Sequence, residues 1–311
     1  MSSRREMLVS LVLSAAFLAY VEANAYRQDL GMLAIAYALL ALGMYLPLAL
    51  CGSLSLAYNA YFAIGAYAVA IISHAAAAWM PVAIPIAVLI SMATAALLGL
   101  VTRRLSGFHL AVATMMFGIA VHTWLLNTDS VTGGATGIGD IPRLDILGWG
   151  LDRGPLIAFG VILVWLIATA IGRLRASLVG IAMRAQRESL VAAAANGVPT
   201  AALRILALAV GAGIATLAGV LLAFMNRFVL PDSFAIKVVF LVLFMPVLGG
   251  LATPWGAVLG ALLVVAFTLG FDFFQGPGSL TFGLLTLGVL LLVPNGLLGG
   301  LAALVGRRRS T

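Results

Sequence analysis

The residue types that usually perform chemistry in proteins are scarce in this chain and do not stand at catalytic spacings. Its one lysine, Lys237, lies between Ile236 and Val238, so the Gly-Lys-Ser/Thr of a phosphate-binding loop does not occur. The three histidines lie in different segments, and the single cysteine, Cys51, permits neither an internal disulfide nor a cysteine cluster for a metal. Gly-x-Ser-x-Gly and His-Glu-x-x-His motifs do not occur either. The sequence therefore predicts a protein that holds no cofactor or metal and does not hydrolyse ATP by itself.

A glycine-rich run, TGGATGIG at residues 132–139, lies in a polar stretch of about residues 127–155, which we call the outer segment. The backbone N–H groups of such a run can cradle a phosphate. No Lys-Ser/Thr follows it, and the orientation derived below places it on the side opposite to nucleotide. We therefore expect a tight turn or a docking surface.

Polar uncharged side chains gather in one otherwise apolar stretch, residues 52–67. Such groups are costly in lipid unless they face protein or water. Two interpretations remain open, close packing between helices and the lining of a translocation pathway. The candidates for a pathway are Ser53, Ser55, Tyr58, Asn59, Tyr61 and, further along the chain, Thr114.

A second polar stretch, residues 173–204, is called the inner segment here. It contains a predicted short helix over residues 190–195, ended by Asn196 and Gly197 with Pro199 just beyond. A helix of this kind can fit a groove on a cytoplasmic partner, or it can lie among lipid headgroups. The residue pattern by itself leaves both possibilities open.

The elements that must position these residues are membrane-spanning helices. Of the 311 residues, 63% are hydrophobic, and only 17 are basic and 10 acidic. A helix needs about 20 apolar residues to cross about 30 Å of hydrocarbon. We predict an all-α polytopic membrane protein with a single transmembrane domain over residues 1–311. The ten predicted spans are about residues 7–24, 30–50, 53–73, 82–101, 107–126, 156–172, 203–224, 233–251, 255–272 and 279–298.

The charges set the orientation. They stand beside the spans and do not line a groove, so the net charge of +7 does not indicate nucleic-acid binding. Placing Arg4 and Arg5 in the cytoplasm puts the basic inner segment there too, and an even number of spans returns the basic C-terminus to the same side. Ionisable groups near the spans are few, Lys237 and Asp272 among them. This scarcity favours a pore energised by a separate protein over an ion-coupled carrier. We expect Lys237 to reach out to Asp232.

Several motifs together resemble one family, the branched-chain amino acid ABC importer permeases, and its LivM-type subunit more than its LivH-type partner. In order they are YALLALG (37–43), GSLSL (52–56), YFAIGAY (61–67), LAVAT (110–114) with FG (117–118), DSVTGGATGI (129–138), PDSF (231–234), VLGGL (247–251) with WG (255–256), and PNGLLG (294–299). The resemblance covers about residues 30–300.

The resemblance implies a multi-pass subunit of the cell inner membrane, with both termini cytoplasmic. It also implies a second permease subunit, two cytoplasmic ATP-binding subunits and an external solute-binding protein as partners. Residues 184–197 match the family's ATPase-coupling loop; the residues carried over are Arg184, Arg187, Glu188, Ala193, Ala194 and Gly197. The outer segment would dock the binding protein, with Asp129, Thr132, Gly133, Gly134 and Gly137 as candidates.

The chain departs from the family pattern at Ala194 and Leu241, where an acid is usual, and at Val293, where an arginine is common. Branched-chain or other aliphatic amino acids are the expected cargo, and urea or amides, nucleosides and sugars are alternatives within the family. Outside it, the rivals are an ion-coupled secondary transporter and a membrane anchor that transports nothing.

Overall fold

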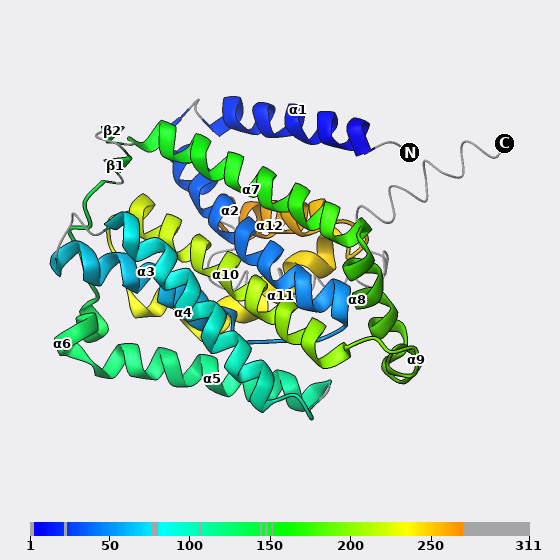
Figure 1. Cartoon of the computed structure of the whole chain (residues 1–311). Helices are drawn as coiled ribbons and strands as arrows, with labels where there is room; N and C mark the ends of the chain where they lie inside the picture. Colours follow the sequence, from blue (N-terminus) through cyan, green and yellow to red (C-terminus); the bar gives the residue numbers. More distant parts are fainter. Residues whose placement is uncertain are drawn as a thin grey trace.

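A computed structural model describes residues 3–21, 24–75, 80–105, 107–143, 145–146, 149–150 and 152–269. The predicted tenth span, Asp272, Val293 and the C-terminal arginines lie outside these described residues. Each of the first nine predicted spans overlaps a helix (Figure 1). The principal helices are α1 (Ser3–Val21), α2 (Ala25–Tyr45), α3 (Tyr58–Ala75), α4 (Met80–Val101), α5 (Phe108–Asn127), α7 (Arg153–Ala176), α8 (Leu178–Glu188), α9 (Leu190–Ala195), α10 (Thr200–Asn226), α11 (Ile236–Gly249) and α12 (Pro254–Leu269).

Short elements join these helices. A π-helical turn, η1 (Leu46–Leu50), continues α2. The outer segment contains α6 (Asp129–Thr132), η3 (Gly134–Thr136) and a hairpin of two-residue strands, β1 (Asp145–Ile146) and β2 (Trp149–Gly150). A 3₁₀ turn, η4 (Pro231–Phe234), precedes α11.

Among the described residues, five helices are long and apolar enough to cross a membrane. They are Ala25–Leu50, Val82–Val101, Phe108–Asn127, Arg153–Ala176 and Thr200–Asn226, and shorter apolar helices cover Ser10–Val21, Ile236–Gly249 and Pro254–Phe267. The all-α, polytopic class predicted from the sequence is therefore confirmed.

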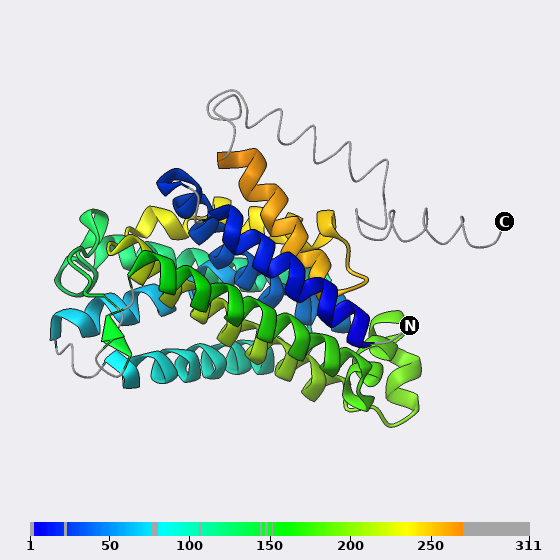
Figure 2. The same cartoon turned by 90° about the horizontal axis from the view of Figure 1, so that it is seen from above.

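The helices α2 and α10 form the centre of the bundle and are its most buried long helices. They approach closely at Gly43 and Gly211, where a Cβ on either glycine would overlap the carbonyl oxygen of the other. Small residues allow this contact, which is typical of helix packing in membranes. The helices α3 and α4 pack against α10, α7 and α12 pack against α2, and α5 packs against α3. The helix α1 lies along α7, where Trp165 Nε1 donates to Ser10 Oγ at 3.2 Å (Figures 1 and 2).

The prediction of one continuous span over residues 53–73 is wrong at its start. Residues 52–57 are not helical, and α3 begins inside the bundle at Tyr58, whose hydroxyl donates to Gly43 O at 2.9 Å beside the middle of α10. Gly52 has a φ of +64°, which ends the preceding helix. The helix α11 also begins inside the bundle, because Asn59 of α3 bonds Phe234 O just ahead of it.

The two polar segments lie at opposite ends of the bundle. The outer segment, with α6, β1 and β2, gathers at one end, and α8 and α9 project from the other (Figure 1). Arg204 joins that second end, since it donates to the carbonyl oxygens of Leu105, Thr102 and Arg103 after α4. Arg204 thus ties the inner segment to the end of α4.

Candidate functional site

Residues 52–57 form a non-helical stretch between α2 and α3, which we call the break. Backbone N–H groups of the break form hydrogen bonds inside the bundle. Ser53 N donates to Pro47 O at 2.9 Å, and Leu56 N donates to Thr114 Oγ1 of α5 at 2.8 Å. Thr114 in turn donates to the carbonyl oxygens of its own helix. Non-helical backbone at membrane depth requires such partners or a water-filled cavity. The break is therefore a built feature of the fold.

Asn59 joins three elements at the start of α3. Its Nδ2 donates to Gly118 O of α5 and to Phe234 O of η4, each at 3.1 Å. Its Oδ1 is buried and has no hydrogen-bond partner among the described residues, and the same holds for Ser55 Oγ. Buried acceptors without partners are uncommon and mark places where a water, a ligand or another conformation can satisfy them.

All six candidate pathway residues are brought together around this break, and all six are buried. Five of them are no more than 3% exposed, and Ser53 is 9% exposed. Tyr58 and Tyr61 pack edge to face with ring centroids 6.0 Å apart. In this conformation the six residues are packed inside the bundle, and Tyr58 lies against Gly43 of α2 and Gly211 of α10.

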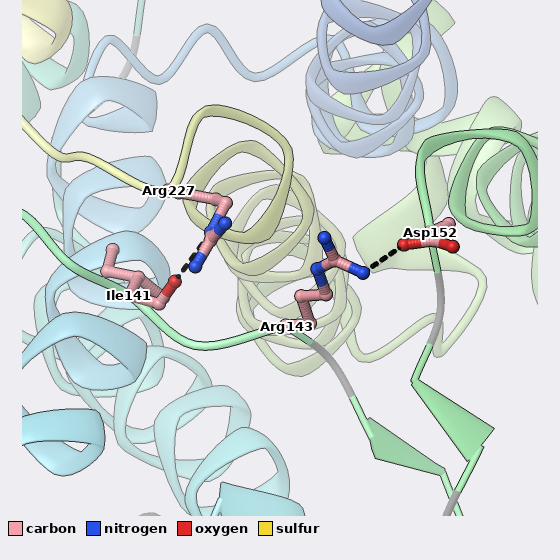
Figure 3. A network of polar contacts seen from close by, with 4 residues as sticks. All are labelled: Ile141, Arg143, Asp152 and Arg227. Carbon is pink, nitrogen blue, oxygen red and sulfur yellow. Dashed lines mark hydrogen bonds and ion pairs between the residues drawn. The ribbon is translucent and has the colours of Figure 1, made fainter.

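The outer segment is fastened to the outer end of α10 (Figure 3). Ile138 and Val229 form an antiparallel bridge, and Arg227 Nε donates to Ile141 O at 3.1 Å. Nearby, Arg143 forms an exposed ion pair with Asp152, which places the two ends of the hairpin side by side. The outer segment therefore follows the end of α10 as one unit.

The candidate docking residues of the outer segment divide by exposure. Asp129 is exposed, Gly133 and Gly137 are half-buried, and Thr132 and Gly134 are buried. The Thr132 hydroxyl donates to Leu125 O at 2.7 Å, so it stabilises the turn and cannot reach a docked protein. The glycines shape the backbone; a Cβ on Gly137 would overlap Val229 O. The tight turn expected from the sequence is confirmed, and the surface open to a partner is formed by the side chains around the glycines.

The inner segment is a pair of capped helices. The Ser177 hydroxyl accepts from Gly180 N at the start of α8, and the Ser189 hydroxyl accepts from Ala192 N at the start of α9. The predicted helix over residues 190–195 is confirmed with the same bounds, and Gly197 follows it with a φ of +76° in open space. Leu190 and Val191 are 56% and 80% exposed, so the tip of this projection is apolar and uncovered.

The six coupling-loop residues do not all face outward. Glu188, Ala194 and Gly197 are exposed, Arg184 is half-buried, and Ala193 packs inward at 5% exposure. Arg187 is also exposed, but its Nη1 turns back toward the bundle and donates to Ala49 O at 2.7 Å. Only part of this set can therefore contact a partner directly.

Some functional contacts give no sequence signal. Arg175 Nη1 donates to the Tyr45 hydroxyl at 3.0 Å, and Tyr45 donates to Leu251 O at 3.2 Å, which joins α7, α2 and the loop after α11. An arginine after an apolar span is expected on charge grounds alone, and its spacing does not show which carbonyl or hydroxyl it reaches. The predicted pairing of Lys237 with Asp232 is confirmed, with Nζ and Oδ2 3.0 Å apart.

Cys51 lies at the inner end of η1 with its Sγ 3.9 Å from Leu203 O. Burial raises the pKa of the Cys51 thiol to about 11, against smaller opposing effects of Gln186 and Arg204. The thiol is therefore mainly neutral at physiological pH and reacts slowly. Among the residues that the structure describes, no group of three or more His, Cys, Asp or Glu side chains could hold a metal ion.

Comparison with known proteins agrees with this architecture. The sequence model of the family "branched-chain amino acid transport system / permease component" matches residues 28–294. The chain is 33% identical over 295 residues to the high-affinity branched-chain amino acid transport system permease protein LivM of Escherichia coli (strain K12), which covers 87% of this chain and 69% of that protein. The LivM protein of Salmonella typhimurium (strain LT2) is 32% identical over the same length, with the same coverage. No solved structure matches the chain. The chain belongs to the family of branched-chain amino acid transport system permease components.

Proposed function

We propose that this chain is one of two permease subunits of an ATP-driven importer for branched-chain amino acids in the cell inner membrane. Its termini lie in the cytoplasm, where two separate ATP-binding subunits supply the energy, and a solute-binding protein delivers the cargo outside. The names of its LivM relatives and its family membership support the cargo class. The transport role agrees with a bundle whose polar groups are uncharged and internal.

The observation that carries this proposal is the free apolar tip of the inner segment. Leu190 and Val191 project from a short capped helix, and α7 and α8, which precede it, carry arginines in their last turns. Exposed apolar side chains on a water-facing loop are typical of a surface that binds another protein. The family resemblance indicates that this tip binds in a groove on a cytoplasmic ATP-binding subunit. The mainly internal hydrogen bonds of the arginines argue against a helix that only touches lipid headgroups.

The outer segment is the proposed contact for the binding protein. Its exposed side chains, such as Asp129, Val131 and Thr136, stand on a turn that is bonded to the end of α10. A protein that docks there would act directly on the outer end of the central helix. Alternating access then follows, because a partner that binds one arrangement of α10 and the break more tightly than the other shifts the population toward it.

The ion-coupled alternative receives no support from the described residues. Their ion pairs are all exposed, and the pair at the start of α11, Lys237 with Asp232, has side chains 66% and 79% exposed. A coupling site in mid-membrane usually holds a buried ionisable group. The departures at Ala194 and Leu241 stay unexplained by the structure.

Reconstitution tests the proposal. The chain, its partner permease and the ATP-binding subunits are placed in proteoliposomes, and uptake of radiolabelled leucine is measured with and without enclosed ATP and added binding protein. We expect uptake only with both, and a Val191→Asp variant should lose most of it while the bundle stays folded. Uptake by the chain without ATP in an ion gradient would favour the carrier instead. ATP-dependent uptake of urea, a nucleoside or a sugar with leucine excluded would keep the importer and change its cargo.

A further inference from the structure

The inner segment meets the break between α2 and α3 through side chains of α8, chiefly that of Arg187. Its Nη1 donates to Ala49 O at 2.7 Å, and its Cγ lies only 3.0 Å from the position that a Cβ on Gly52 would take. The contact thus covers both sides of Cys51, where the helix ends and the non-helical stretch begins. Gln186 of the same helix also reaches this junction, where its side chain hydrogen-bonds the Cys51 thiol.

The carbonyl group that Arg187 binds belongs to an unusual helix end. The turn η1 is π-helical and contains Pro47, and Ala49 is among its last residues. The last carbonyl groups of a helix lack partners within it, and they carry partial negative charge. A guanidinium that donates to such a group forms a charge-assisted bond, which is stronger than a neutral one. Arg187 is therefore a firm attachment for the inner end of α2.

From Ala49, a short series of hydrogen bonds continues into the bundle. Ser53 N bonds Pro47 O, Leu56 N bonds Thr114 Oγ1, and Asn59 bonds α5 and η4. Every step from Ala49 to Asn59 is buried except Gly52 and the half-buried Leu54. We therefore expect a displacement at Ala49 to move the start of α3, because the residues between them are closely packed and transmit the shift.

The helix α8 is stiff enough to deliver such a displacement. Gly180 sits so close to Leu174 O that a Cβ there would overlap it, and the Ser177 cap closes the turn between α7 and α8. Met183 and Gln186 are buried at 1% and 4% exposure on the inward face. Residues 188–190, with the Ser189 cap at their centre, separate Arg187 from the exposed tip at Val191.

We propose that Arg187 is a positioning residue that transmits movement of the inner segment to the break, so that partner closure on α9 moves residues 52–57 and uncovers the start of α3. In this role Arg187 acts inside the chain and does not dock the ATP-binding subunit. The inference rests on the proposed function, since it requires an ATP-driven partner.

The test uses the complete importer in proteoliposomes, with R187Q, R187K and the matched control R173Q. Arg173 is an exposed arginine of the same end of the bundle that makes no side-chain hydrogen bond within the described part of the chain. We expect R187Q to assemble and to hydrolyse ATP, while uptake per ATP falls by about tenfold because a charge-assisted bond is lost. R187K retains a cationic donor and should recover part of the coupling, and R173Q should stay within about twofold of the wild type.

A second readout follows the break itself. Cys51 is the chain's single cysteine, so its labelling by a small maleimide can be followed on the separated subunit. In the wild type and in R173Q, the labelling rate should differ between the nucleotide-free and the vanadate-trapped complex, and in R187Q this difference should disappear. Normal uptake per ATP in R187Q, loss of assembly in both Arg187 variants, or a wild-type labelling rate that ignores nucleotide would each overturn the inference. A wild-type complex without ATP-dependent uptake would instead refute the proposed function.

Discussion

The outer and inner segments are both polar interruptions of an apolar chain, yet they are attached to the bundle in opposite ways. The outer segment is joined through its backbone, by the bridge between Ile138 and Val229 and by glycines that leave no room for side chains. The inner segment is joined through side chains, chiefly Arg187 and Arg175, and its far end is free. The first is fixed to both α5 and α10, because Thr132 bonds Leu125 O of α5. The second can be pushed at its tip and can act as a lever on the helices it touches.

The largest expected effect breaks the outer attachment. In G137A, the new Cβ would overlap Val229 O, and the backbone has φ 72° and ψ −165°, a region that is almost exclusive to glycine. We expect a loss of about 3 kcal/mol or more in the free energy of unfolding, because strain and overlap add. Denaturation of the purified chain in detergent measures it. Wild-type stability in G137A would show that the segment is not fixed to α10.

The next effect concerns the packing under the inner segment. Burial raises the pKa of the Cys51 thiol from 9.0 to about 11, so near pH 8 its thiolate should be about a hundredfold scarcer than that of a free cysteine. Maleimide labelling of the nucleotide-free protein should be slow and should accelerate as the pH approaches 11. The raised pKa also means that the neutral thiol stabilises the fold below about pH 9 and that this stability is lost as the pH rises toward 11. Fast labelling at pH 7 would show that the inner end is open.

A matched glycine sharpens the comparison. In G197A, the residue again has positive φ, at +76°, but its Cβ would meet nothing within 4 Å. We expect only the backbone strain, about 1 kcal/mol of unfolding free energy. Uptake per ATP should nevertheless fall, because the end of α9 changes shape where the partner would bind. Equal destabilisation of G137A and G197A would remove the distinction between the two segments.

The smallest effect is expected for R143Q in the outer segment. The side chains of Arg143 and Asp152 are 59% and 68% exposed, and solvent screens such a pair. The unfolding free energy should change by no more than about 0.5 kcal/mol. A large loss would mean that side chains, and not only backbone contacts, fasten this segment.

The positions of the helices could be predicted because each membrane-spanning helix appears in the sequence as a run of about 20 apolar residues. The caps of α9 were also readable, since Asn196, Gly197 and Pro199 have local backbone preferences. The break was missed, although the alternation of serine and leucine over residues 53–56 is a pattern of extended chain. The long apolar stretch around these four residues indicated a continuous helix and outweighed their short alternation. The inward turn of Arg187 and the links of Asn59 could not be predicted, because they depend on which distant carbonyl groups tertiary packing places within reach.

The break has a consequence for how the chain enters the membrane during synthesis. The N–H of Leu56 is satisfied by Thr114, which lies 58 residues later in the sequence. A bare amide is costly in hydrocarbon, so residues 52–57 are poorly suited to leave the insertion machinery sideways before α5 is made. We therefore expect α3 to be retained near the translocon, or to enter lipid only together with the helices that follow it.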